Sequence, residues 1–171
     1  MDFKDLSHAR YSLRKFSDAP VEQEKLDLIL EAARSAPTAH NRQPQRILVC
    51  RSEAAKERVL KATPFHFGAP LLLVVACDEE GSWHRECDGK PHGEIDTALA
   101  IGQMMLQAAD LGLGTTYIGV FDPQVLKAEL AEELKGLTPL AVLPLGYPRE
   151  DAHPSRLHAE RKPVEELVRY L

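Results

Sequence analysis

Three polar residues near the start of the chain have the side chains that a phosphate ester requires. Arg10, Ser12 and Arg14 place two guanidinium groups and a hydroxyl group close together. Guanidinium groups bind phosphate oxygens bidentately, and each charge-assisted hydrogen bond contributes about 1.5–3 kcal/mol. Two interpretations stay open: a phosphate-binding segment, or a solvated basic turn that balances nearby acids. Taken alone, the triplet favours the turn.

A second polar cluster occupies the loop from Ser35 to Pro44. Thr38, Asn41 and Gln43 offer hydrogen-bond donors and acceptors without net charge. Such groups can bind the edge of a heteroaromatic ring or a polyol chain. The alternative is a rigid turn whose side chains satisfy its own backbone.

Other motifs give weaker signals. His84, Cys87 and His92 could bind a metal, but no fourth ligand follows at a familiar offset, so we predict no metal site. Gly112 and Gly114 come after a helix and before a strand, which is the reverse of the dinucleotide-binding order. The sequence has no Gly-x-Ser-x-Gly motif, no P-loop and no paired carboxylates.

The segment from Ile95 to Gly119 is the element around which we expect the chain to be organised. Its first part reads as a helix with apolar residues on two faces, so we expect burial from two directions. One narrow polar stripe contains Asp96, Gln103, Gln107 and Asp110. The helix should end at Gly112, and a strand from Thr115 to Ile118 should end at Gly119, where a ligand can approach the backbone. The alternative is a plain core helix that its own chain covers on both faces.

Local patterns predict the remaining elements. Helices are expected over residues 3–8, 21–34, 53–62 and 124–134, and strands over 46–50, 71–76 and 140–147. Asp122 and Pro123 form a helix start, whereas Pro144 implies an edge, a bulge or an unpaired position in its strand. Residues 78–93 are a polar connection, either a lid or a disordered loop. The class is α/β or α+β, with helices on both sides of a small sheet.

Composition excludes several classes of function. The 171 residues carry a formal net charge of -5, which gives no support to nucleic-acid binding. No apolar run is long enough for a membrane helix, and the first residues lack the apolar region of a secretory signal. Three cysteines at no framework spacing fit a reducing cytoplasm.

Taken together, four stretches of the sequence resemble the nitroreductase family of flavin enzymes. They are RYSLRKF at 10–16, EAARSAPTAHNRQPQRILV at 31–49, LGLGTTYIGVFD at 111–122, and LPLGYPRE at 143–150 with ERKPVEELV at 160–168. Each stretch is loose by itself, but their order and distances are specific. The resemblance extends over nearly the whole chain.

The resemblance implies an α+β, three-layer fold with a mixed or antiparallel central sheet and helices on both sides. It implies an intertwined homodimer that holds two FMN molecules in its interface, with the long helix as a main dimer contact. Residues 1–171 would form a single domain, in which residues 148–171 are a C-terminal extension that packs on the dimer.

The resemblance also assigns the cofactor-binding residues. Arg10, Tyr11, Ser12 and Arg14 match the segment that holds the phosphate and ribityl chain, and Arg161 matches a basic residue that returns to the phosphate. The loop residues Pro37, Thr38, Asn41 and Gln43 match a loop that reaches the flavin partly from the partner subunit. Ile118, Gly119 and Val120 match the strand end that faces the ring near N5. Tyr11 replaces a second Arg or a His of many members, so its role is expected to be a backbone contact.

The implied activity is reduction of nitroaromatic, quinone or similar small electron acceptors in a ping-pong reaction. NADH or NADPH would give a hydride to flavin N5 and leave before the acceptor binds, and no catalytic side chain is needed. Arg14 is the candidate to stabilise reduced flavin, unless it binds the phosphate. The alternatives are a flavin-binding or sensing protein with little turnover, or another reductive activity on the same scaffold. The chain is short for the family, so regions that shape the substrate pocket are reduced.

Overall fold

The apolar run at residues 71–76 forms the centre of the molecule. In the computed structural model, which describes residues 2–171, this run becomes strand β2 (Leu71–Cys77), and each of its residues is buried. β2 pairs in antiparallel fashion with β1 (Gln45–Cys50) and with β4 (Thr138–Gly146). A strand that is buried on both faces needs apolar side chains in both directions, which explains why the run does not alternate with polar residues.

The sheet has four strands in the order β1-β2-β4-β3, and every strand pair is antiparallel. β3 (Gly114–Thr115) is shorter than the predicted strand, because beyond Thr115 only Ile118 pairs with β4, as an isolated bridge to Val142. Along this register Pro144 faces Thr116 and has no N–H to donate. Pro144 therefore lies in an interior strand, opposite Leu72 of β2, and is unpaired only on the side that faces β3.

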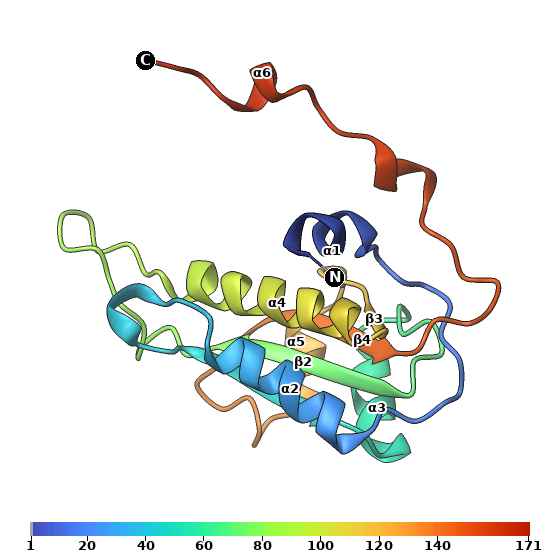
Figure 1. Ribbon diagram of the computed structural model, residues 1–171. Helices are drawn as coiled ribbons and strands as arrows, with labels where there is room; N and C mark the ends of the chain where they lie inside the picture. The colour runs from blue at the N-terminus through green and yellow to red at the C-terminus, as the bar shows by residue number, and fades with distance from the viewer. Residues whose placement is uncertain (1) are drawn as a thin grey trace.

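Helices cover both faces of the sheet, so the predicted three-layer α+β fold is confirmed (Figure 1). One face packs against α2 (Gln23–Arg34) and α4 (Gly93–Asp110), and the other packs against α3 (Glu53–Leu60) and α5 (Pro123–Glu129). The short helix α1 (Phe3–Ala9) lies against α4. This arrangement places α4 between the sheet and α1.

The long helix α4 has two apolar faces, as predicted, but its own chain covers only one of them. Ile101 and Met104 are fully buried in the core, whereas Ile95 and Leu99 are 45% and 48% exposed. The alternative of a helix covered on both faces by its own chain is therefore wrong. The predicted polar stripe also needs a correction, because Asp96 is buried, where its carboxylate accepts a hydrogen bond from a loop.

Two segments near the end of the chain complete the fold. The Asp122 side chain caps α5 by accepting hydrogen bonds from the next turn, as predicted, although the helix ends at Glu129 and not at residue 134. Residues 149–171 include the short helices η2 (Arg156–Ala159) and α6 (Val164–Leu167). The first part of this tail contacts the N-terminal segment through Asp151 and His158, and its last residues extend away from the sheet (Figure 1). Apolar side chains are exposed along this tail: Leu157, Val164, Leu167, Val168, Tyr170 and Leu171. Within residues 2–171, no helix is long and apolar enough to span a membrane.

Candidate functional site: an anion site and a loop at opposite ends of one helix

The Arg10–Arg14 segment is fixed to the sheet by its central leucine. Leu13 is 1% exposed, and its N–H donates to the Thr115 carbonyl at 2.9 Å. Ser12 forms a parallel bridge with Thr115. Gly114 leaves the space for this contact, since a Cβ atom there would lie 2.8 Å from Leu13 Cβ. The core therefore positions Ser12 and its two neighbouring arginines beside β3.

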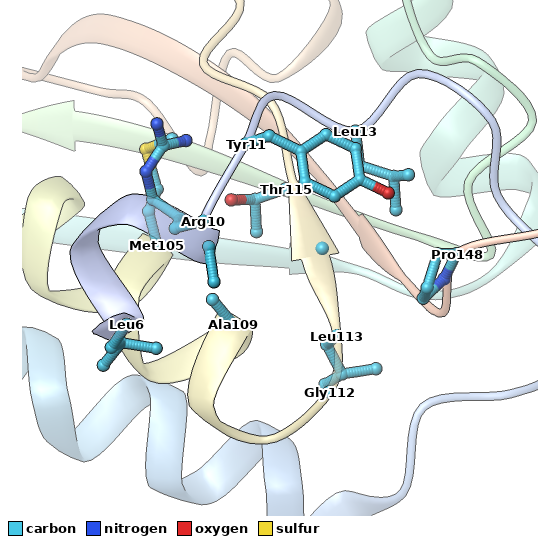
Figure 2. Close-up of a pocket in the computed structure, with 12 residues that line it drawn as sticks. Leu6, Arg10, Tyr11, Leu13, Met105, Ala109, Gly112, Leu113, Thr115 and Pro148 are labelled. Carbon is cyan, nitrogen blue, oxygen red and sulfur yellow. The ribbon is translucent and has the colours of Figure 1, made fainter. Parts of the chain in front are cut away.

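A cavity of about 180 Å3 lies between this segment, α1 and the end of α4 (Figure 2). Most of its lining is apolar, and Arg10, Tyr11 and Thr115 supply the polar groups. Figure 2 shows the Thr115 side chain between those of Arg10 and Tyr11. Thr115 is 3% exposed, and its Oγ1 has no hydrogen-bond partner among the described residues. A buried hydroxyl group without a partner costs free energy, so this atom is suited to a ligand.

The tail brings a second cation close to Arg10. The ring of His158 packs edge-on against Tyr11 with centroids 6.2 Å apart, and its Nε2 lies 3.0 Å from the His8 carbonyl oxygen. Burial lowers the pKa of Arg10, and the nearby Arg161 guanidinium lowers it further. Arg161 lies between the ion pairs Arg156–Glu160 and Lys162–Glu166 and takes part in neither.

These charges make the cavity a candidate anion site, which is called the anion site below. Both influences on the pKa of Arg10 disfavour its charged form, so the isolated chain holds two like charges together at a cost. A phosphate group between Arg10 and Arg161 would offset that cost with charge-assisted hydrogen bonds. Arg14 is exposed beside them, and its Nη1 donates to the Ser12 carbonyl at 3.4 Å. Of the residues that the sequence predicts for a phosphate, Arg10 and Arg161 therefore have the charge and the surroundings that such a group requires.

The predicted ring-binding residues lie further along the same sheet edge. Ile118 is buried and exchanges two 3.0 Å backbone hydrogen bonds with Val142, whereas Gly119 and Val120 are exposed. The Thr63 hydroxyl group donates to the Val120 carbonyl at 2.8 Å, which holds this turn in place. Gly119 and Val120 border an open hollow that Ala62, Pro64, Phe121 and Pro123 also line. A planar group could therefore lie against exposed backbone here.

The Pro37–Gln43 loop lies at the other end of α4. The Ala39 N–H donates to Asp96 Oδ2 at 3.1 Å, and the Gln43 N–H donates to Thr38 Oγ1 at 3.1 Å. The Gln43 amide group also donates to the Asn41 carbonyl at 3.2 Å. The interpretation as a turn that satisfies its own backbone is thus correct for Thr38 and Gln43. Pro37, Asn41 and Gln43 are nevertheless exposed.

One chain does not bring the two clusters together. The loop contacts Asp96 in the first turn of α4, whereas Arg10 and Tyr11 line a cavity with Ala109 in its last turn. Thirteen residues of helix correspond to roughly 20 Å. The loop also precedes β1, and Ser12 adjoins β3, so the clusters lie on opposite edges of the sheet. These two edges are separated by about 14 Å across the strands, in addition to the separation along α4.

The candidate metal ligands have other contacts. His84 Nδ1 lies 3.2 Å from the Ser82 carbonyl oxygen, the His92 ring packs edge-on against Trp83, and Cys87 is exposed. Among residues 2–171, no group of three His, Cys, Asp or Glu side chains has a metal-binding arrangement. The loop that contains these residues folds back on itself through a bridge between His84 and Pro91.

For two residues at the anion site, the sequence predicted no binding role. Thr115 was predicted only as a strand residue, and His158 had no predicted role. A hydroxyl group next to a glycine, on an inward position of a strand, is the signal that could have indicated Thr115. No local pattern indicates His158, because its contact with Tyr11 joins the two ends of the chain.

Fold and site together define a class: a three-layer α+β protein with an anion site beside an uncharged, exposed strand end. Comparison with known proteins narrows the class to a family. The model of the Nitroreductase family matches residues 8–64 and 59–147. The chain therefore belongs to the nitroreductase family, which confirms the resemblance seen in the sequence.

Individual relatives agree with this assignment. A crystal structure of a nitroreductase family protein from Clostridium difficile 630 is 37% identical, with a TM-score of 0.91 over 99% of this chain and 98% of that one. The NADH dehydrogenase of Thermus thermophilus is 30% identical over 98% of this chain and 95% of its own. The FMN reductase [NAD(P)H] of Bacillus subtilis is 31% identical over 81% of this chain and 63% of its own.

Proposed function

We propose that this protein is an NAD(P)H-dependent FMN oxidoreductase that reduces small electron acceptors such as nitroaromatics and quinones. The observation that carries the proposal is the cavity that Arg10 lines together with Thr115, whose buried hydroxyl group has no partner; Arg161 lies near enough to lower the pKa of Arg10. This arrangement is suited to the phosphate and the polyol chain of FMN. The FMN reductase of Bacillus subtilis, a relative at 31% identity, supports the same cofactor and co-substrate.

We assign the predicted residues to parts of the cofactor. Arg10, Ser12, Arg14 and Arg161 bind the phosphate and the ribityl chain, and Tyr11 holds the tail through His158. The backbone of Ile118, Gly119 and Val120 lies against the ring. The loop of one chain reaches the flavin ring that is bound to the second subunit, through Pro37, Thr38, Asn41 and Gln43. It cannot reach the flavin of its own chain, because the anion site of that chain lies at the far end of α4.

A homodimer is part of the proposal. Ile95 and Leu99 leave one face of α4 uncovered, and residues 148–171 expose apolar side chains along their length. Two copies of α4 that cross in opposite directions would bring each Pro37–Gln43 loop toward the anion site of the other chain. In this arrangement residues 1–171 form one domain, and its C-terminal extension packs on the partner.

The protein residues bind and orient, and they need not exchange protons. Bound FMN would accept a hydride from NADH or NADPH and pass the electrons to the acceptor. The exposed backbone at Gly119 lets a planar ring approach closely, and the open hollow beside Val120 leaves room for a second planar molecule. The arginines hold the phosphate end and so fix where the ring lies.

The test is an anaerobic titration of the purified protein. We expect it to bind FMN, and the bound flavin should bleach within seconds when NADH or NADPH is added. Nitroaromatics and quinones should then restore the yellow colour. Failure to bind FMN would overturn the proposal. Binding without bleaching would identify a flavin-binding or sensing protein instead.

A further part of the proposal concerns Arg14, which is exposed beside the anion site. If its charge stabilises the reduced ring, Arg14→Ala should lower the reduction potential of bound FMN, because anionic flavin would lose a nearby cation. An unchanged potential with weaker FMN binding would assign Arg14 to the phosphate. Arg34→Ala is the control, because Arg34 is paired with Glu31 on α2.

We also propose a cytoplasmic location. Cys50, Cys77 and Cys87 are all free thiols, which fits a reducing compartment.

A further inference from the structure

The Pro37–Gln43 loop has a backbone conformation that the hydrogen bonds of its own Thr38 and Gln43 side chains explain only in part. His40, Asn41 and Gln43 have φ angles of 52°, 54° and 50°, in the left-handed region that favours glycine. None of the three is a glycine. Backbone of this kind persists only where several contacts fix it, so contacts from outside the loop should add to the hydrogen bonds within it.

One contact comes from α4. Asp96 is 3% exposed, and its Oδ2 accepts a hydrogen bond from the Ala39 N–H at 3.1 Å. This bond fixes the residue immediately before the strained positions. It does not involve the exposed side chain of His40.

The second contact comes from Trp83, in the connection between β2 and α4. The rings of Trp83 and His40 stack with centroids 5.3 Å apart and planes 13° apart. Trp83 is held in turn by α4, because His92 packs edge-on against it at 4.7 Å and donates its backbone N–H to the Trp83 carbonyl at 2.9 Å. The indole ring therefore lies between the start of α4 and the strained loop.

Hydrogen bonds also join the start of the connection (residues 78–93) to the residues that follow the Pro37–Gln43 loop. The Asp78 N–H donates to the Pro44 carbonyl at 2.9 Å, and the Arg46 guanidinium group pairs with the Asp78 carboxylate at 3.0 Å. With both ends joined, the segment of residues 78–93 supports the Pro37–Gln43 loop. This gives the polar connection a role that neither a lid nor a disordered loop would have.

We propose that Trp83 is a positioning residue that holds the Pro37–Gln43 loop in its flavin-binding conformation. The inference rests on the proposed function, in which Thr38, Asn41 and Gln43 contact FMN. A loop that is already ordered loses less conformational entropy when the ligand binds, so it binds more tightly. Trp83 touches the loop through His40 and acts on the cofactor only through it.

The first test needs no cofactor. In the FMN-free protein, hydrogen exchange should be measured at the backbone amides of residues 39 and 41–43, for Trp83→Ala, Trp83→Phe and His84→Ala. An aromatic stack corresponds to about a two- to tenfold change in an equilibrium, so Trp83→Ala should speed exchange by that factor. Trp83→Phe should restore most of the protection. His84→Ala, in the same connection but outside the stack, is the matched control. Equal exchange in Trp83→Ala and the wild type would overturn the inference.

The second test uses the FMN-bound protein. Trp83→Ala should bind FMN about two- to tenfold more weakly and shift the reduction potential of the bound flavin, and Trp83→Phe should reverse both effects. A wild-type affinity and potential in Trp83→Ala would overturn the inference. A wild-type protein that binds no FMN would instead overturn the proposed function, while the exchange measurement still decides the role of Trp83.

A folding defect would not block the tests. If Trp83→Ala fails to fold, His40→Ala removes the other ring of the stack at an exposed position. It should raise the exchange rate of the same amides, and an unchanged rate would contradict the inference.

Discussion

Arg161 is a single residue near the end of the chain, yet the electrostatics of the anion site depend on it. It lies close enough to Arg10 to lower the pKa of that guanidinium, and it takes part in neither of the ion pairs that flank it. Some other arginines are committed to carboxylates: Arg58 is paired with Glu133 and Arg46 with Asp78. The Nη1 of Arg161 donates to the carbonyl groups of His158 and Glu160, but within residues 2–171 no ion pair neutralises its charge, which is therefore available for a ligand.

Replacing Arg161 tests this directly. Arg161→Ala should weaken FMN binding by roughly tenfold to a hundredfold, because it removes charge-assisted hydrogen bonds to the phosphate. It should leave the thermal stability of the FMN-free protein unchanged or slightly raised, because the like charge beside Arg10 disappears. Arg156→Ala, five residues earlier and paired with Glu160, is the control in an FMN titration followed by fluorescence. Equal affinities of the two variants would contradict the assignment.

Gly114 offers a second prediction for a single position. In Gly114→Ala the new Cβ would lie 2.8 Å from Leu13 Cβ, and Leu13 is buried, so the segment that contains Ser12 must shift. We expect a loss of about 1–3 kcal/mol in the free energy of unfolding and weaker FMN binding. Gly102→Ala is the matched control, since a Cβ there meets nothing within 4 Å. Urea denaturation of both variants would measure the difference.

Among the elements, the C-terminal end of α4 is held by a chain of three side chains. Lys25 donates to the carbonyl of Leu111, at the end of the helix, at 3.2 Å and to the Tyr147 hydroxyl oxygen at 2.6 Å. The Tyr147 hydroxyl group donates to the Glu22 carboxylate at 2.8 Å. These contacts connect α2, α4 and the end of β4 next to the anion site.

This chain of contacts predicts a pH dependence. The pKa of Glu22 is lowered, first by its own backbone N–H and then by the Tyr147 hydroxyl group, so its contribution is lost as the pH falls below the usual value of 4.5. The pKa of Lys25 is raised, chiefly by Tyr147, so its contribution is lost as the pH rises above 10.5. Tyr147→Phe should therefore lower Tm by a few degrees between these limits.

Thermal melts at several pH values would check this prediction. The difference between Tyr147→Phe and the wild type should shrink in acid, where Glu22 is protonated in both. Tyr170→Phe is the control, because Tyr170 is 91% exposed in the tail. A difference that stays constant down to low pH would show that Glu22 plays no part.

The sequence predicted those elements whose cause is local. β2 follows from an unbroken apolar run, and α5 follows from the cap that Asp122 and Pro123 form. β3 was predicted too long, because the interruption comes from Pro144, which is distant in the sequence. Asp96 was assigned to a polar stripe, because a helical pattern does not reveal that a loop covers that side chain.

The candidate site also combines features that have a local cause in the sequence with features that do not. Arg10, Ser12 and Arg14 adjoin one another in the sequence, so their shared chemistry could be recognised there. The approach of Arg161 to Arg10 could be predicted only from the family resemblance, because it depends on how a tail without hydrophobic periodicity crosses α1. The contact between Trp83 and His40 likewise joins two loops that no periodic pattern connects.

At the scale of the whole molecule, the separation of the two clusters makes a prediction about subunits. In the proposed dimer, each flavin site takes Arg10 from one chain and Asn41 from the other. A mixture of Arg10→Ala and Asn41→Ala chains should therefore form heterodimers with one intact site and one doubly altered site. Unfolding and refolding the two variants together should restore activity that neither has alone.

The alternative arrangement gives a different result. If each site were built within one chain, every site in the mixture would keep one defect, and mixing would restore nothing. Mixing Arg10→Ala with the double variant Arg10→Ala/Asn41→Ala is the control, because no intact site can form. Activity after co-refolding, compared with that of each variant refolded alone, distinguishes the arrangements.

The exposed tail has a consequence for how heat resistance should be measured. Leu157, Val164 and Leu167 are exposed in the single chain, and in the proposed dimer they would be buried against the second copy, so part of the stability would depend on association. We expect Tm to rise as the protein is concentrated and to fall on dilution. A purified sample kept in dilute storage should then lose its tail contacts first, and a protease should cut it there before it reaches the sheet.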